Sequence, residues 1–114
     1  MARVVMLLAF GPGQPDGDVG NRLELTVALT PQGGLDEAAF GEAPWATRRL
    51  LPDGRELAGQ LVRAGDGWVL LGPAGEDGPA WDLEGRVFRP GEYVTLRRPN
   101  GDELIFRVVD VRVE

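Results

Sequence analysis

The sequence of 114 residues contains no cysteine, histidine, serine or lysine, and all 12 of its basic residues are arginine. Each absence excludes a kind of chemistry. Without serine or cysteine there is no serine or cysteine nucleophile, without histidine no imidazole base or metal ligand, and without lysine no Schiff base. Disulfides and cysteine-held cofactors are excluded by the same count. We therefore expect no cofactor, and we do not expect an enzyme.

What is present describes one domain spanning residues 1–114. A chain of this size buries roughly two-thirds of the surface that its unfolded form exposes, so neither a disulfide nor a metal is needed to hold it together. The formal net charge is -6, and the arginines are spread from Arg3 to Arg112. Both facts oppose binding to a phosphate backbone, so we expect no nucleic-acid partner. The use of arginine alone is typical of GC-rich coding. We expect a bacterial, cytoplasmic protein.

The first residues have the order of a short signal peptide, because Arg3 precedes an apolar run that ends at Phe10. The run lies at the lower length limit for such a peptide, and no Ala-x-Ala cleavage site follows it. It is also too short to span a bilayer. We interpret Ala2 to Phe10 as a buried β-strand and expect no membrane association.

Alternation of apolar and polar residues runs through nearly the whole chain, and 17 glycines and 9 prolines fall mostly between the alternating segments. This pattern predicts an all-β fold, either a compact antiparallel β-barrel or a β-sandwich of about seven or eight strands. The expected strands lie near residues 2–10, 22–30, 45–51, 55–63, 68–72, 80–88, 92–98 and 103–113. One short helical turn is expected near 35–40, where Leu35 and Phe40 would close an open end of the β structure.

Two turns have the same form, Pro52-Asp53-Gly54 and Pro99-Asn100-Gly101. Proline, Asp or Asn, and glycine in this order predict a three-residue hairpin loop with a bulge. That loop places Leu96 opposite Leu104, Val94 opposite Phe106 and Arg97 opposite Glu103. A third hairpin is expected around Asp66-Gly67. The apolar face of the last strand changes phase near Val108 and Val109, which predicts a second bulge.

The segment Phe88-Arg89-Pro90-Gly91-Glu92-Tyr93-Val94-Thr95-Leu96 resembles the Pro-Gly-Asp/Glu-x-Val entry into a strand of SH3-like and other small barrels. The resemblance covers fewer than ten residues. It implies only that a loop enters a strand here, and it supports the fold class alone.

Four residues are candidates for a binding site: Trp45, Arg49, Trp68 and Trp81. Each tryptophan begins an expected strand beside proline or glycine, and we expect the three to gather at one end of the barrel. The first hairpin places Arg49 opposite Leu57, so its guanidinium points inward and must meet a carboxylate or an anionic ligand. An ion pair with Glu42 or Asp82 is the simpler outcome.

Acidic residues offer weaker candidates. Asp16 and Asp18, in the loop after Phe10, are possible calcium ligands, although the loop lacks the bidentate glutamate and flanking helices of an EF-hand. Two acidic pairs, Glu76-Asp77 and Asp82 with Glu84, are the nearest approach to a catalytic dyad.

These observations favour a noncatalytic protein-binding or assembly module, with a protein partner or self-association. One alternative is a barrel that holds a small anionic or aromatic ligand against Arg49 and the tryptophans. A second alternative is a carboxylate- or metal-dependent hydrolase.

Overall fold

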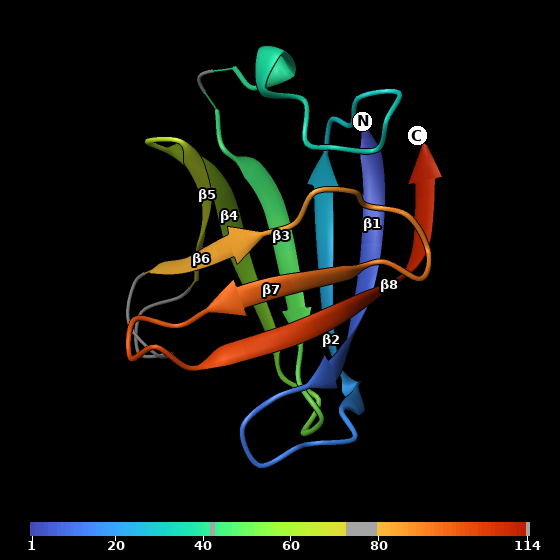
Figure 1. Cartoon of the computed structure of the whole chain (residues 1–114), viewed down its shortest axis with the longest axis vertical. Helices are drawn as coiled ribbons and strands as arrows, with labels where there is room; N and C mark the ends of the chain where they lie inside the picture. Colours follow the sequence, from blue (N-terminus) through green and yellow to red (C-terminus); the bar gives the residue numbers. More distant parts are fainter. Residues whose placement is uncertain (42, 73–79, 114) are drawn as a thin grey trace.

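The computed structural model describes residues 1–41, 43–72 and 80–113. In these ranges eight strands form a closed antiparallel barrel, in which each strand pairs with its neighbours in sequence and the last pairs with the first (Figure 1). The strands are β1 (Ala2–Phe10), β2 (Asp18–Val27), β3 (Trp45–Leu50), β4 (Glu56–Ala64), β5 (Gly67–Leu71), β6 (Ala80–Glu84), β7 (Tyr93–Arg97) and β8 (Glu103–Val113). Closure decides between the two predicted architectures in favour of the barrel.

Closure also removes the unpaired strand edges that an open sheet presents. Each of the eight strands has a hydrogen-bonded neighbour on both sides. Edge-to-edge pairing with another chain is therefore blocked. Among the described residues, no helix is long and apolar enough to cross a membrane.

Inward-facing aliphatic and aromatic side chains fill the barrel. A row of paired residues crosses four strands from Trp45 through Leu61 and Leu70 to Trp81. The largest fully buried side chains are Phe88, Phe106, Met6, Leu23, Leu25, Leu61, Leu96, Val4, Val27, Val94 and Val108. The described interior is thus a packed core.

Both proline-led hairpins have the predicted loop. The Arg98 N–H donates to the Asp102 carbonyl at 2.8 Å, and Gly101 takes the left-handed conformation with φ of +94°. Leu96 pairs with Leu104 and Arg97 with Glu103, as predicted. The third hairpin turns one residue earlier than expected, at Gly65-Asp66, because Gly67 still pairs with the last residue of β4.

The predicted bulge in β8 is confirmed. Met6 pairs with Val108 and Val5 pairs with Asp110, so Val109 has no partner on β1 and is 41% exposed. The extra residue reverses the alternation and bends the strand as it passes around the barrel.

The sixth strand is shorter than predicted, because it ends at Glu84 and does not reach residue 88. The chain leaves the sheet at Gly85 and inserts Phe88, only 1% exposed, into the core. A side chain at position 85 would have its Cβ 2.9 Å from the Phe88 ring, so glycine is needed there. The Phe88 N–H donates to the Gly33 carbonyl at 2.8 Å, which joins this turn to the segment that covers the same end of the barrel.

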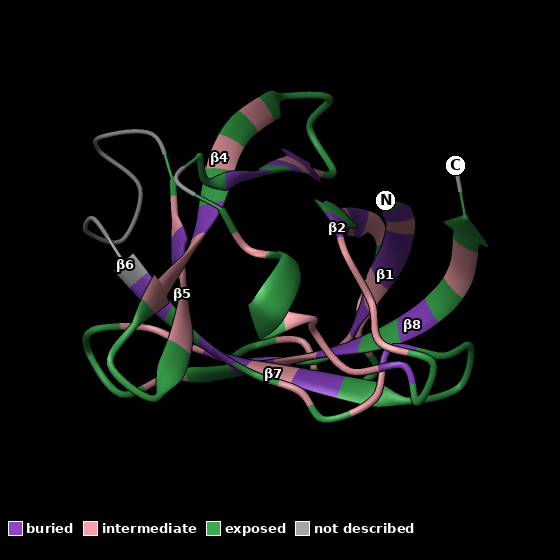
Figure 2. Ribbon diagram, turned by 90° about the horizontal axis from the view of Figure 1, so that it is seen from above, coloured by how far each residue is buried: buried purple, intermediate pink, exposed green. Residues whose placement is uncertain are grey.

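The predicted helical turn is present as one 3-10 turn, η1 (Glu37–Ala39). Asp36 caps its start by accepting a hydrogen bond from the Ala39 N–H. Leu35 and Phe40, on either side, pack against the core. Seen from above, the turn lies over the barrel opening, as predicted (Figure 2).

Candidate functional site

Two of the predicted site tryptophans, Trp45 and Trp68, meet at the capped end of the barrel. Their rings stack with centroids 5.1 Å apart and an interplanar angle of 12°. The Phe40 ring contacts both edge-on, at 5.0 Å from Trp45 and 5.3 Å from Trp68. Arg63 places its guanidinium 5.2 Å from the Trp68 ring centre. We call these four side chains the aromatic end.

Arg49 and Trp81 form a separate cluster. Arg49 faces inward opposite Leu57, as predicted, and is 8% exposed. Its Nε donates to Asn21 Oδ1 at 3.3 Å, and its guanidinium lies 4.7 Å from the Trp81 ring centre. The Arg98 guanidinium lies 5.0 Å from the same ring. The indole thus contacts two cations, an arrangement favoured by the negative faces of its ring.

The expectation that all three tryptophans gather is therefore only partly met, because Trp81 contacts Arg49 and not the Trp45–Trp68 stack in the described part of the chain. The predicted ion pair with Asp82 was wrong: Asp82 is exposed and alternates with the buried Trp81 and Leu83, so it lies on the outer face of β6. Glu42, the other predicted partner, lies outside the described residues.

A small cavity lies beside this second cluster, lined by Thr47, Arg49, Gly59 and Trp81 among others. Gly59 is needed where β3, β4 and β5 approach one another. A Cβ there would lie 2.6 Å from the Leu71 carbonyl oxygen and 2.7 Å from Thr47 Oγ1.

The acidic candidates do not converge. Asp18 accepts hydrogen bonds from the Gly20 N–H at 2.8 Å and from Gln14 Nε2 at 3.1 Å, which closes its own loop, while Asp16 is exposed. Glu84 pairs with Arg97 at 2.7 Å on the outer surface. Within residues 1–41, 43–72 and 80–113, no three acidic side chains gather as metal ligands would. Glu76 and Asp77 lie outside the described residues.

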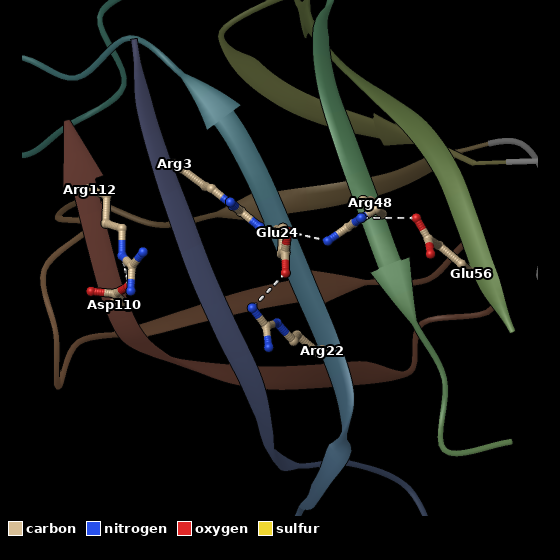
Figure 3. A network of polar contacts seen from close by, with 7 residues as sticks. All are labelled: Arg3, Arg22, Glu24, Arg48, Glu56, Asp110 and Arg112. Carbon is tan, nitrogen blue, oxygen red and sulfur yellow. Dashed lines mark hydrogen bonds and ion pairs between the residues drawn. The ribbon is translucent and has the colours of Figure 1, made fainter. Parts of the chain in front are cut away.

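Sequence reasoning missed a third feature, on the outside of the barrel. Five arginines that are far apart in the sequence lie on the outer surface of β8, β1, β2 and β3. They are Arg3, Arg22, Arg48, Arg107 and Arg112. Strand register brings them together: Arg112 pairs with Arg3, while Arg107 and Arg22 flank Leu7 on either side. We call this surface the arginine face; part of it is drawn in Figure 3.

A buried carboxylate, Glu24, lies at the centre of the arginine face. Glu24 Oε1 accepts from Arg3 Nη2 and from Arg48 Nη2, each at 3.0 Å, and Arg22 Nη2 lies 2.7 Å from Oε2 (Figure 3). Glu24 is 5% exposed, whereas the three arginine side chains are 39 to 43% exposed. The carboxylate is therefore enclosed by guanidinium groups that still reach water.

Burial acts to raise the pKa of Glu24, but the hydrogen bond from Arg3 and the charges of Arg22 and Arg48 outweigh it. The net result is a pKa below its ordinary value. The charges of Glu24 and Glu56 in turn raise the pKa of Arg48, whose Nη1 lies 3.1 Å from Glu56 Oε1. Asp110 pairs similarly with Arg112, at 2.8 Å. These ion pairs hold the arginines in place on the sheet.

No protein-family model, curated protein or solved structure matches this chain. The argument for function therefore starts from the chain's own geometry, which offers the aromatic end, the Arg49–Trp81 cluster and the arginine face.

Proposed function

We propose that this barrel is a noncatalytic module that binds an acidic protein through the arginine face. The observation that carries the proposal is the separation of charge. The chain has 12 arginines and 18 acidic residues. Among the described residues, the arginine face and its border hold five of the arginines, and three acidic residues pair with them there, namely Glu24, Glu56 and Asp110. The rest of the described chain has seven arginines and eleven acidic residues.

Such a distribution favours a partner with an acidic surface. A positive patch on a negative protein orients an incoming acidic partner, raising its association rate and selecting against basic ones. Guanidinium groups also bind carboxylates through paired hydrogen bonds, which adds directional specificity.

Three features make the arginine face and its border suitable for contact. Arg107 is exposed and forms no ion pair with any residue that the structure describes. Its cross-strand neighbour Tyr93 is 60% exposed, and tyrosine and arginine are both enriched where proteins meet. The ion pairs with Glu24 hold Arg3, Arg22 and Arg48 in place before binding, which lowers the entropy that binding must overcome.

Charge reversal tests the proposal. Arg107→Glu combined with Arg112→Glu changes the arginine face without touching Glu24. Arg55→Glu combined with Arg86→Glu changes the net charge equally, at exposed positions elsewhere. In native pull-downs from the source organism, the wild type and the second variant are expected to recover the same acidic protein, and the first variant to lose it. Equal recovery by all three, or no partner for the wild type, would contradict the proposal.

Salt dependence provides a second measurement on the same complex. Because charge pairs on an exposed surface are screened over about 8 Å at physiological ionic strength, recovery should fall as salt is raised. Binding that is insensitive to salt would indicate a different surface.

One observation favours the small-ligand alternative: the cavity that Arg49 and Trp81 line with Thr47. A small anion held there would alter the fluorescence of Trp81. The cavity has a volume of about 30 Å³, so a small inorganic anion is the suitable probe. Titration of the wild type with nitrate or phosphate, compared with Trp81→Phe, tests this alternative, and identical responses of the two proteins would rule it out. The hydrolase alternative and the bacterial, cytoplasmic setting stay predictions.

A further inference from the structure

The turn that closes the aromatic end is held to the barrel mainly by side chains. Asp36 donates its N–H to the Ala28 carbonyl at 2.9 Å. Beyond it, the described residues 37–41 make backbone hydrogen bonds only within the turn, from Ala39 to Asp36 and from Phe40 to Glu37. None of the three residues of η1 is buried. A segment with so few backbone hydrogen bonds to the rest of the protein has a low free energy of local opening.

Two side chains of this turn make its contacts with the strands. The Phe40 ring lies edge-on to the stacked tryptophans, and Glu37 Oε2 lies 3.3 Å from Arg63 Nη2. Glu37 is 68% exposed and Arg63 is 27% exposed, so water reaches this ion pair. After Asp36, the contacts that hold this turn to the strands include one aromatic ring and one carboxylate, three residues apart, while Leu35 packs against the core before it.

The surface that receives them belongs to the strands. Trp45 comes from β3, Arg63 from β4 and Trp68 from β5, and ladder pairing fixes all three: Trp45 with Leu61, and Arg63 with Trp68. Indole faces and a guanidinium are groups that bind aromatic rings and carboxylates. The strands thus form a site before any ligand binds, and the side chains of Glu37 and Phe40 on the turn occupy it.

We propose that Trp45, Arg63 and Trp68 of the aromatic end form a peptide-binding site, which the chain's own Glu37 and Phe40 occupy. It accepts from a partner a helical turn that presents a carboxylate and an aromatic ring three residues apart. The partner's segment takes the place of the turn, while the strands and their register stay unchanged. Because the tethered turn competes at high effective concentration, the site binds a free peptide weakly until the turn is displaced. This site is separate from the arginine face, and neither proposal depends on the other.

The test supplies the ligand in trans. The receptor is the full chain with Glu37→Ala and Phe40→Ala, which empties the site. The probe is a labelled synthetic peptide with the sequence of residues 33–41 and blocked ends, and binding is measured by fluorescence anisotropy. We expect the double variant to bind this peptide at least about tenfold more tightly than the wild type does. A peptide with alanine at the Phe40 position should not bind.

Two further variants make the outcome specific. Adding Trp68→Ala to the double variant should abolish binding, because the stacking partner is lost. As a control, Phe10→Ala removes an exposed aromatic ring far from this turn in sequence, and the variant should bind the peptide no better than the wild type does. A folded double variant that ignores the peptide, or equal binding by the wild type and the double variant, would overturn the proposal.

Circular dichroism first checks that the receptor is folded. If the double variant is unfolded, Phe40→Leu with Glu37→Ala replaces it, since leucine keeps much of the apolar volume but lacks the ring. If neither variant folds, Phe40 is an indispensable part of the core. That result would also overturn the proposal.

Discussion

Replacing Glu24 with glutamine removes one negative charge from the centre of the arginine face and leaves its shape nearly unchanged. Three guanidinium groups then surround a neutral amide. Breaking a buried ion pair by removing one partner costs roughly 3–5 kcal/mol. Here the arginine side chains are 39 to 43% exposed, so water screens part of the repulsion that remains. We therefore expect a loss of about 2–3 kcal/mol in the free energy of unfolding.

Urea unfolding at neutral pH, followed by tryptophan fluorescence, measures this loss. The urea concentration at the unfolding midpoint should fall. The slope of the unfolding free energy against urea concentration should stay the same, because the surface exposed on unfolding does not change. In a domain of this size, each kcal/mol of lost stability lowers the melting temperature by about 4 °C. The melting temperature should therefore fall by roughly 8–12 °C.

Glu103→Gln is the matched control. Glu103 accepts from Arg97 Nη2 at 2.8 Å, but it is 50% exposed. Such a surface pair contributes at most about 1 kcal/mol. Equal losses in the two variants would refute the argument that burial among three arginines sets the size of the effect.

The pH dependence follows from the lowered pKa of Glu24 in the folded state. A carboxyl whose folded pKa lies below its unfolded value contributes stability that is present above the unfolded value, and that is lost as pH falls through the folded value. The stability difference between wild type and Glu24→Gln should be complete at neutral pH and shrink below the ordinary value of 4.5. If the stability difference between the two proteins stays constant down to the lowest pH at which both still fold, the electrostatic explanation is refuted.

Three further predictions concern single positions and are measured by urea unfolding. Gly59→Ala should destabilise the barrel by roughly 1–3 kcal/mol, because the new Cβ meets a backbone oxygen at 2.6 Å, whereas Gly72→Ala meets nothing within 4 Å and should be nearly neutral. Arg49→Ala removes the stack on Trp81 and the bond to Asn21 and should cost about 2–4 kcal/mol, against less than about 1 kcal/mol for the exposed Arg55→Ala. Gly101→Ala should cost about 1–2 kcal/mol, because alanine resists the φ of +94°; an unchanged midpoint would contradict the turn assignment.

The strands and hairpin registers were predictable because their causes are local. Alternation assigns each residue of a strand to one face. A proline, Asp or Asn, and glycine in the right order set the loop, and the loop then sets pairs such as Val94 with Phe106. The bulge at Val109 was also visible in the sequence, since one extra residue reverses the alternation.

The end of β6 was not predictable in this way. Trp81 to Val87 continues to alternate, yet the chain leaves the sheet at Gly85 because Phe88 fills space inside the barrel. That space is formed by strands distant in sequence, so no local pattern reports it. The same reason explains the tryptophans, whose neighbours depend on how far each strand is displaced along the barrel wall.

The sequence by itself determined where the strands lie, which of them pair in hairpins and which residues face inward, because all three depend on turns and on alternation between neighbouring residues. Only the tertiary structure decided which arginines come together on the arginine face. Arg3 and Arg112 lie near opposite ends of the chain and pair only because β8 closes against β1. Glu24 is buried only because arginines on three adjacent strands reach it. These arginines are widely spaced in the sequence, and barrel closure brings them together on one face.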